Sequence, residues 1–599
     1  MKLKQQIKKV LSFVLNPKET LIANKYTTDT TILSNEEHIR LACNWLLLSQ
    51  EKSGDDGYSR QYSLFNKKWD RGYIETTGYI IPSLIEAGKK LNEKKYIDSA
   101  LKAGEWLLKI QNNDGSFSDI DEGSPQVFDT GQCLIGFNYL YEYTKENKYL
   151  EAIQKTTNWL IDIQEENGSW VKFAYNSISH SYYSRVAAAL FKAGIILDNE
   201  NIKNSALKQV KWVLDNQFEN GYFNYCEFER DVDAVLHTII YVLEGLLDIY
   251  DFTKDKKVLE AVLKNVNKLK EINLNRDLIL CSQYDKNFNC TNDEKCITGL
   301  AQWAGVLLRL YKIEKNEDYK KLAIRTIHYL KSKHIKEGEN LKGALPGSVL
   351  FYGYYGSCSF MNWNNKFFID TLLMYDKYEI SLEYEQEIYS GACFSFLKGV
   401  VTNDLTSMDK KYLKQFDNFF EKFKNQKYTI LDLGCGKGKF LNHFKINYIN
   451  WKVIGVEPNY TDKQNNILSG SAYKIPLPDN SVDIVYIVEV LQHIKYLDTA
   501  FSEIRRVLNR GGYVVIGDRN PYSWLGLLKP LLEKKGKWMY PKDSAYKEQW
   551  YNISQWQDIF KQNGVNFISY KVINSDDNYK GIYFFNRYYF MVGKLNGKS

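Results

Sequence analysis

The sequence predicts two folds in succession: an all-α ring of six helical hairpins, then an α/β domain of the doubly wound, Rossmann-like kind. A unit marked by tryptophan and glycine recurs in the front of the chain, with apolar residues at helical steps. Near residue 430 the pattern changes to an apolar strand, a glycine turn and an amphipathic helix. At 599 residues, of which 44% are hydrophobic, the chain is long enough for several globular domains.

Charge and cysteine content narrow the class of protein. The net charge of +7 is small for this length, and lysines alternate with acidic residues, so we expect no nucleic-acid partner. The nine cysteines form no CxxC pair, and Cys281, Cys290 and Cys296 have no histidine close by in the sequence. We therefore expect no metal, and free thiols in a reducing cytoplasm.

Residues 1–35 form a basic amphipathic segment. Leu3, Ile7, Val10, Leu11 and Val14 lie at helical spacing among lysines. We expect this helix to pack on the protein itself, and the alternative is peripheral contact with an anionic membrane surface. No apolar run reaches the ~18 residues that a membrane-spanning helix needs.

The repeat occupies residues 36–378. "NWLLLSQEKSGDDGYS" from Asn44 recurs as "EWLLKIQNNDGSFSD" from Glu105, "NWLIDIQEENGSWVK" from Asn158 and "KWVLDNQFENGYFNY" from Lys211. Two weaker copies follow, which makes six. Each unit contains two helices and a glycine stop, and such hairpins bury their apolar faces only by closing on one another. We expect the tryptophan and glutamine before each turn to act mainly in packing and capping.

This pattern resembles the six-hairpin (α/α)6 toroids, which include terpenoid cyclases, polysaccharide lyases, unsaturated glucuronyl hydrolases and uronyl epimerases. The resemblance implies a substrate cleft, here called the mouth, where the inner helices begin. Aromatic residues there would stack on sugar faces, and His, Tyr and Arg would suit proton abstraction beside a uronate. The candidate substrate-binding residues are Tyr73, Glu75, Asp129, His180, Tyr183, Arg185, His237, Trp303, Trp363 and Lys366.

Residues 379–426 are expected to form a helical linker, and residues 427–599 the α/β domain. "KYTILDLGCGKGKF" holds Asp432 two residues before Gly434, and "DxGxGxG" resembles the first motif of class I S-adenosylmethionine (SAM) methyltransferases. "GSAYKIPLPDNSVDIVYIVEVLQHI" and "RVLNRGG" fit the later strands of that family. The tail "KGIYFFNRYYFMVGKL" is expected to form a final edge strand.

The resemblance implies SAM as cofactor and a set of residues that hold it. Asp432 would face the cationic end of SAM, and Glu457 the ribose hydroxyls. Many relatives have aspartate where this chain has Ser471, which leaves adenine recognition there open. The cofactor-binding candidates are Asp432, Gly434, Cys435, Gly436, Gly438, Glu457, Ser471, Ala472 and Glu489.

Two residues are candidates for the chemistry of transfer. His493 follows the fourth strand and is the candidate base, while Arg519 ends the fifth strand and suits an anionic acceptor. An aromatic and basic insertion after Arg519 would cap the acceptor; it includes Trp524, Trp538, Tyr540, Tyr546 and Trp550.

Together these features predict a methyltransferase for a carbohydrate or lipid-linked glycan of surface-polysaccharide biosynthesis, with the toroid binding the glycan. Two alternatives stay open. In the first, the toroid is itself a uronyl epimerase or lyase. In the second, the toroid is a scaffold and the acceptor is a protein or a terpenoid-type lipid. We expect the protein in the cytoplasm, with peripheral attachment to the inner face of the membrane as an open point.

Overall fold

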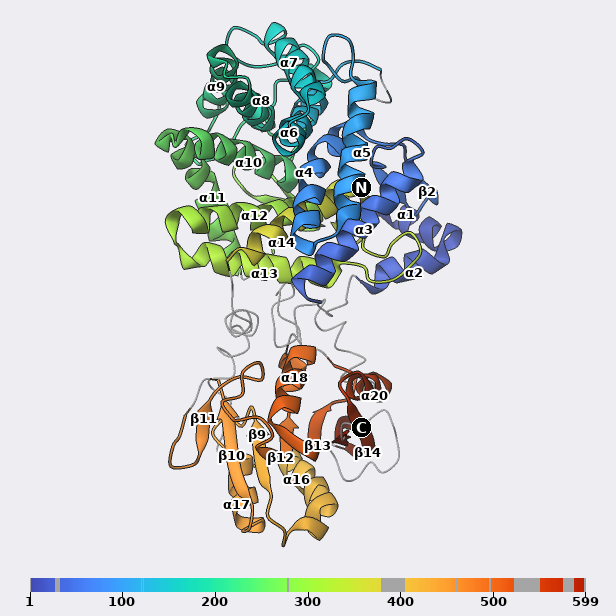
Figure 1. Cartoon of the computed structure of the whole chain (residues 1–599), viewed down its shortest axis with the longest axis vertical. Coiled ribbons are helices and arrows are strands. Elements are labelled where there is room, and N and C mark those ends of the chain that lie inside the picture. The colour runs from blue at the N-terminus through green and yellow to red at the C-terminus, as the bar shows by residue number, and fades with distance from the viewer. Residues whose placement is uncertain are drawn as a thin grey trace. The chain divides into compact units, whose positions relative to one another are not determined.

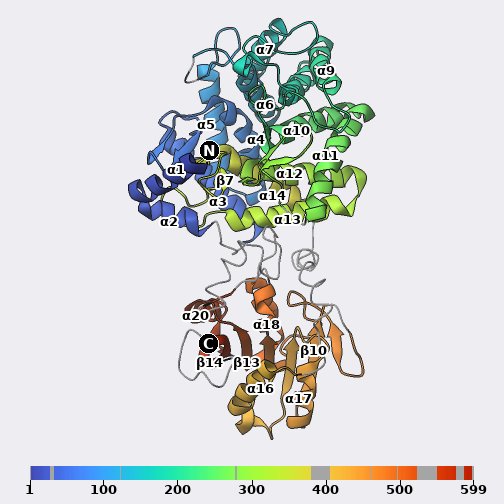
Figure 2. The same cartoon turned by 180° about the vertical axis from the view of Figure 1, so that it is seen from behind.

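Figures 1 and 2 show the computed structural model, which describes residues 2–26, 33–119, 121, 123–276, 279–378, 405–458, 461–494, 497–521, 550–574 and 586–596. The chain divides into two compact units, Met1–Glu379 and Ile380–Ser599. Among the described helices, none combines the length and the apolar character needed to cross a bilayer.

The first unit is the predicted ring of hairpins. The inner helices are α4 (Ile74–Leu91), α6 (Val127–Thr144), α8 (Ser184–Ile196), α10 (Leu236–Thr253), α12 (Ile297–Glu314) and α14 (Asn362–Asp376). The outer helices are α3 (Asn35–Ser53), α5 (Lys94–Ile110), α7 (Asn147–Asp162), α9 (Glu200–Asp215), α11 (Lys256–Arg276) and α13 (Glu317–Lys333). The last inner helix, α14, packs against α4 and α3, which closes the ring (Figure 1).

The repeated glutamine joins neighbouring hairpins. The Gln164 side-chain amide donates to the carbonyl of Gly168 at 2.8 Å and to that of Ser205 on the next outer helix at 3.0 Å. Gly168 has φ +91°, and a Cβ there would lie 2.4 Å from the Lys208 backbone. Glycine is therefore required where the turn meets the next helix. The packing and capping role predicted for this glutamine is confirmed.

The two ends of the ring differ in their connections. Inner helices lead to outer ones through tight turns, as at Asn92 and Lys145, which cap α4 and α6 in the left-handed conformation. The return connections are longer and carry short strands. Those strands are β1 (Gln61–Ser63), β2 (Lys68–Trp69), β3 (Ala234–Val235), β4 (Gln283–Tyr284), β5 (Cys290–Asn292), β6 (Lys295–Cys296), β7 (Ser348–Val349) and β8 (Ser359–Met361). The 3-10 turns η1 (Tyr175–Ser177) and η2 (Ser181–Tyr183) precede α8.

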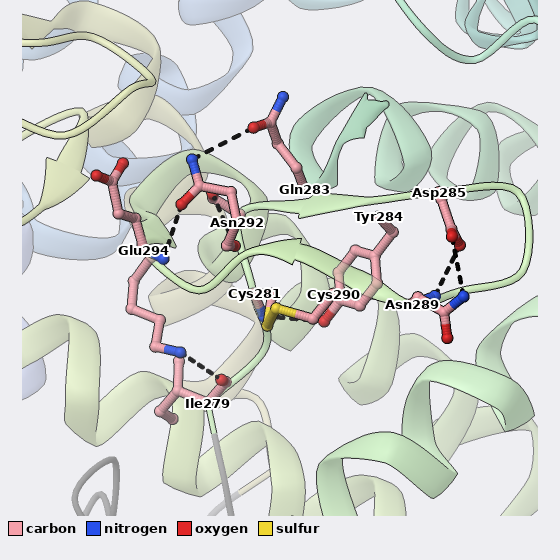
Figure 3. The surroundings of a disulfide bond; sticks show 11 residues. Ile279, Cys281, Gln283, Tyr284, Asp285, Asn289, Cys290, Asn292 and Glu294 are labelled. Carbon is pink, nitrogen blue, oxygen red and sulfur yellow. Dashed lines mark hydrogen bonds between the residues drawn. A yellow bond between two sulfur atoms is a disulfide. The ribbon is translucent and has the colours of Figure 1, made fainter. Parts of the chain in front are cut away.

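A disulfide in one of these connections corrects the prediction of free thiols. Cys281 and Cys290 are bonded, with their Cα atoms 5.9 Å apart (Figure 3). The β4–β5 hairpin brings them together, and Asp285 accepts from the backbone and side chain of Asn289 at its end. The other described cysteines are buried thiols. The disulfide was not predictable from the sequence, because a β-hairpin and not a short cysteine motif brings the two residues to bonding distance.

Helices α1 (Lys2–Leu15) and α2 (Pro17–Lys25) precede the ring and lie beside it at its edge (Figures 1 and 2). The apolar stripe of α1 is exposed, at Ile7, Val10, Leu11 and Val14. The segment does contact the rest of the protein, but through its polar face and not through this stripe.

The second unit is the predicted α/β fold, built on a seven-stranded sheet. In the order of the sheet its strands are β11 (Ile467–Ser469), β10 (Lys452–Glu457), β9 (Thr429–Leu433), β12 (Val482–Val488), β13 (Leu508–Arg519), β15 (Asn586–Leu595) and β14 (Val565–Asn574). The strands from β11 to β13 are parallel, and β15 is antiparallel to both of its neighbours. The helical segments are α16 (Ser407–Phe420), η3 (Glu421–Phe423), α17 (Lys439–Asn447), η4 (Leu491–His493), α18 (Leu497–Val507) and α20 (Ile553–Gln562).

The tail strand is not the edge strand that the sequence predicted. β15 inserts between β13 and β14, so β14 takes the edge. Consecutive residues Tyr589, Phe590, Met591 and Val592 are buried, because a central strand has both faces covered.

Part of the predicted linker belongs to the second unit. Tyr412, Phe416 and Phe420 of α16 are buried in a core cluster with Phe440 and Tyr486. Residues 379–404 lie outside the described part of the chain, and so do Trp524, Trp538, Tyr540 and Tyr546 of the insertion.

Candidate functional site

The glycine turn of the second unit lies at the carboxyl end of β9, where the strand order reverses between β10 and β12. Ligands of doubly wound sheets bind at such a point. Gly434, Gly436 and Gly438 all have positive φ, at +78°, +54° and +83°. A Cβ on Gly434 would lie 2.5 Å from Val490, so a side chain there is excluded.

Two acidic residues flank this turn. Glu457, at the end of β10, accepts a hydrogen bond from the Gly436 backbone N–H at 3.1 Å. Asp432 is buried, and its Oδ2 has no hydrogen-bond partner among the described residues. Burial raises the pKa of Asp432 to about 8, with Lys439 lowering it and Glu457 raising it. An uncompensated buried carboxylate is costly unless a ligand supplies the missing donor.

The other cofactor candidates surround the turn. Cys435 is buried, with its Sγ 2.7 Å from where a Cβ on Gly455 would lie. Ser471 begins a tight turn in which its Oγ accepts from the Tyr473 backbone N–H at 3.2 Å. Ala472 is buried in the core, so it offers a ligand little surface.

Glu489 and Arg519 pair at the carboxyl ends of β12 and β13. Arg519 Nε donates to Glu489 Oε2 at 3.1 Å, and its guanidinium lies 5.4 Å from the Trp550 ring. The Tyr412 hydroxyl donates to Glu489 Oε1 at 3.3 Å. Arg519, predicted to bind an anionic acceptor, is thus already paired, and Glu489 lies beside it.

His493 sits in η4, half-buried, with its Nε2 3.1 Å from the Gln492 amide nitrogen. The Gln492 amide also lies 3.5 Å from Glu489 Oε2. His493, Glu489 and Arg519 therefore occupy one end of the sheet. Sequence reasoning missed Tyr412 and Gln492; the amphipathic pattern of α16 was the available signal for Tyr412.

In the toroid, the predicted mouth residues separate into three groups. Glu75 lies among aromatic side chains at the start of α4. Burial raises its pKa to about 7, while hydrogen bonds from Tyr73, Tyr79 and Tyr241 and the charge of Arg185 oppose that rise. Burial and the charge of Glu75 raise the pKa of Asp129.

Trp363 completes this mouth group. Its ring centroid is 6.3 Å from that of Tyr73, and its Nε1 donates to the Tyr355 hydroxyl at 3.0 Å. Tyr73, Glu75, Tyr355 and Trp363 are all partly exposed. The group thus presents carboxyl, hydroxyl and aromatic surface together.

A second group, Arg185 and Lys366, lies deeper in the ring than predicted. The Ser184 hydroxyl donates to the Val242 carbonyl at 3.1 Å, so α8 begins more than a turn along α10. Arg185 therefore reaches Glu244, to which its Nη1 donates at 2.7 Å. Lys366 pairs with Asp370 at 2.7 Å.

A central layer crosses the ring at this level, with one side chain from each inner helix. It consists of Tyr79, Gln132, Arg185, Tyr241, Gln302 and Phe367. Except for Arg185 these residues were missed. For Gln132 and Gln302 the signal was a polar residue within an otherwise apolar inner helix. His237 joins this layer through Gln302, 2.6 Å from its Nδ1, and burial lowers its pKa to about 3.

The third group is structural. His180, Tyr183 and Trp303 are fully buried. The Tyr183 hydroxyl accepts from the Tyr175 backbone N–H at 3.0 Å, and His180 Nε2 lies 3.1 Å from the Tyr175 carbonyl. His180 and Tyr183 hold the connection before α8, and Trp303 lies buried within α12, so none of the three offers surface to a substrate.

Beyond the central layer lies the barrel pocket, a cavity of about 450 Å³ between the carboxyl-terminal halves of the inner helices. Ion pairs of Arg185 with Glu244, Arg309 with Asp248 and Lys366 with Asp370 line it, each at 2.7 Å. The rings of Tyr79, Tyr139, Phe252 and Phe367 also face it. Asn138 Oδ1, buried in its wall, has no hydrogen-bond partner among the described residues.

Comparison with known proteins identifies the second unit. Residues 431–516 match the methyltransferase domain family. An uncharacterized methyltransferase of Schizosaccharomyces pombe is 36% identical over 17% of this chain and 40% of its own length. A sterol 24-C-methyltransferase of Gibberella zeae is also 36% identical, over 16% of this chain and 27% of its own length. The chain thus spans less than half the length of these curated relatives.

Solved structures resemble both units. An unsaturated glucuronyl hydrolase specific for heparin is 17% identical, with TM-score 0.48, over 58% of this chain and 97% of its own. A cellobiose 2-epimerase from Bacillus thermoamylovorans is 13% identical, with TM-score 0.46, over 56% and 98%. A SAM-dependent methyltransferase from Archaeoglobus fulgidus is 18% identical, with TM-score 0.25, over 34% and 98%.

The methyltransferase domain implies SAM as its cofactor, and the residues present fit that ligand. The unpartnered Asp432 oxygen would accept from its cationic amino group, and Glu457 would accept from its ribose hydroxyls. Bound SAM supplies a methyl group on a positively charged sulfur. The glycine turn leaves room for that ligand, because a Cβ on Gly434 would meet Val490.

Proposed function

We propose that this chain is a SAM-dependent methyltransferase for a carbohydrate or lipid-linked glycan, made during surface-polysaccharide biosynthesis, which the toroid binds. The transferase half rests on the domain match and on the unpartnered carboxylate oxygen of Asp432. The fusion supports a shared substrate, because tethering raises the effective concentration of acceptor near the methyl donor.

The observation that carries the glycan half is the lining of the barrel pocket. Three ion pairs supply donors and acceptors to it, and Tyr79 and Phe367 add aromatic surface. Sugar hydroxyls both donate and accept hydrogen bonds, and sugar rings pack on aromatic faces. The mouth group, with Tyr73 and Trp363, offers a second surface of the same chemistry.

The test follows the methyl group. The purified chain is incubated with methyl-labelled SAM and with polysaccharide, lipid-linked saccharide, protein and sugar-free lipid fractions of its source organism. We expect label in the saccharide fractions and none with Gly434→Arg. Label confined to protein or sugar-free lipid contradicts the glycan assignment.

Matched variants then locate the glycan. Phe252 lines the barrel pocket and is 37% exposed, whereas Phe218 lies outside its lining and is 39% exposed. Phe252→Arg fills the pocket and Trp363→Ala opens the mouth, and we expect one of them to lower transfer at least about tenfold. Phe218→Arg is the control, and SAM affinity should stay constant throughout. Unchanged transfer in both test variants contradicts glycan binding by the toroid.

A second candidate function is acid–base chemistry by the toroid itself, of the epimerase or lyase kind. Its motivating observation is Glu75, whose pKa burial raises to about 7 beside the Tyr73 and Tyr241 hydroxyls. A group that titrates near neutral pH suits a general base. Glu75→Gln would then abolish a change in the saccharide that occurs without SAM, and leave methyl transfer intact.

The relatives favour a third candidate, a lipid acceptor with the toroid as scaffold, because one of them is named a sterol methyltransferase. Label in sugar-free lipid would support it. We also propose a cytoplasmic location. Its test is the state of Cys281 and Cys290 in cells: a disulfide that persists in protein alkylated at lysis would contradict that location, because disulfides persist mainly in oxidising compartments.

A further inference from the structure

The amino-terminal helix α1 turns its apolar side chains outward. Ile7, Val10, Leu11 and Val14 follow one another at steps of three, one and three residues, which places them on one face of a helix. Their exposed fractions are 50%, 61%, 37% and 69%. An ordinary surface helix turns such a stripe toward the core, so α1 has the reverse orientation.

Contacts with α2 and with the ring fix this orientation. Ser12, on the face of α1 opposite the stripe, is buried, and its carbonyl accepts from the Thr20 hydroxyl at 2.9 Å. Asn16, which follows α1, is also buried and donates from Nδ2 to Glu19 at 3.0 Å.

Glu19 in turn binds the toroid. Its Oε1 accepts from the Asn340 backbone N–H and side-chain amide, both at 3.1 Å. The Tyr62 hydroxyl donates to its Oε2 at 2.5 Å. Since Glu19 is buried in α2, the two helices are attached to the ring by their polar face, and the apolar stripe is left pointing away.

The positive charge of the segment indicates which kind of surface covers the apolar stripe. The sequence of α1, "KLKQQIKKVLSFVL", contains four lysines and no acidic residue, and Lys18 follows as an exposed side chain. A second copy of this helix would bring like charges together. An anionic lipid surface instead supplies negative headgroups beside an apolar layer of the depth that such a stripe enters.

We propose that α1 is a docking helix that lies in the surface of an anionic membrane, with Val10 and Val14 inserted between lipid chains. This inference goes beyond the proposed methyl transfer and does not depend on it. It would hold the toroid at a membrane whatever the acceptor is.

The test is co-sedimentation of the full chain with vesicles, without SAM or acceptor. Vesicles of phosphatidylcholine doped with phosphatidylglycerol should bind the chain, more weakly as salt is added. Phosphatidylcholine alone should bind it far less. Val10→Glu combined with Val14→Glu should lower the partition coefficient at least about tenfold, because both valines leave the apolar layer.

Ile446→Glu combined with Ile449→Glu is the matched control, since both isoleucines are exposed in the second unit, at 74% and 82%. The control should bind like the unchanged chain. Three results overturn the proposal: no binding to anionic vesicles, equal loss in both double variants, or sedimentation without lipid that Val10→Glu with Val14→Glu abolishes. The third would show that a second copy covers the stripe. None of these results bears on methyl transfer.

Discussion

At the scale of single residues, Asp432 sets a pH dependence for cofactor binding. Burial raises its pKa in the free protein to about 8, so the carboxyl is protonated below that pH. A cationic ligand favours the ionised form, and binding below pH 8 must therefore release the proton. We expect SAM affinity to fall as the pH drops from about 8 toward 6.

Isothermal titration calorimetry in buffers of different protonation enthalpy measures the released proton directly. Asp432→Asn should weaken SAM binding roughly ten- to a hundredfold, because a charge-assisted hydrogen bond is lost. It should also flatten the pH dependence. An unchanged slope in Asp432→Asn would assign the titration to another group.

A buried histidine pair makes the toroid sensitive to acid. His38 and His334 are fully buried, with their Nδ1 atoms 2.7 Å apart. Burial lowers the pKa of His334 to about 3, below the value of about 6.5 for an unfolded histidine. The unfolded chain therefore binds more protons, and the toroid should lose stability as the pH falls below about 6.5.

Thermal unfolding measured between about pH 7 and about pH 4 tests whether the toroid loses stability below the pKa of an unfolded histidine. His334→Asn should reduce the acid-induced drop in melting temperature, even if it lowers the temperature at pH 7. Equal drops in both proteins would remove this pair from the explanation.

At the scale of elements, the β4–β5 hairpin carries a disulfide that is directly measurable. Lys286 lies between Cys281 and Cys290, so trypsin separates the two cysteines. A digest alkylated without reductant should contain the two peptides joined as one mass, which splits after reduction. Two separate alkylated peptides from protein purified under oxidising conditions would contradict the bond.

Helix α16 should behave as part of the second unit. Phe416 is fully buried and its ring lies 4.9 Å from that of Phe444 and 5.4 Å from that of Tyr486. Phe416→Ala should lower the free energy of unfolding of the second unit by about 3–5 kcal/mol. Lys414→Ala, at an exposed position of the same helix, should change it by less than about 0.5 kcal/mol.

Differential scanning calorimetry separates the two units if they melt apart. A shift confined to the methyltransferase transition fits the structure, whereas a shift of the toroid transition would assign α16 to the first unit.

What sequence could predict at this scale depends on periodicity. The Trp159 and Gln164 repeat marks helix ends locally, so the ring was predictable, and so was strand β9, which contains Asp432. The position of Arg185 was not, because it depends on how far α8 slides along α10. The disulfide and the inner place of β15 likewise depend on pairings between distant segments.

At the scale of the whole molecule, the two units carry complementary halves of one proposed reaction. In the central layer, Gln132 accepts from Arg185 and Gln302 donates to Glu244, which joins α6 to α8 and α10 to α12. The second unit holds Asp432 and Glu457 on adjacent strands. Gln132 and Gln302 were recognisable as polar residues in apolar helices, but the level at which the side chains of all six hairpins meet was not predictable, and neither was the barrel pocket.

The closing hairpin has a consequence for how the toroid is made. Its outer helix, α3, is among the first parts of the ring to be synthesised, and its inner partner, α14, is the last. On the ribosome α3 must wait until residue 376 has emerged before it meets its partner. A chain that stops before α14 leaves the ring open, and the apolar faces of α3 and α4 that contact α14 stay exposed. Production of the intact ring is therefore all-or-none, whereas a permuted chain with α3 placed behind α14 would complete each hairpin as it is made.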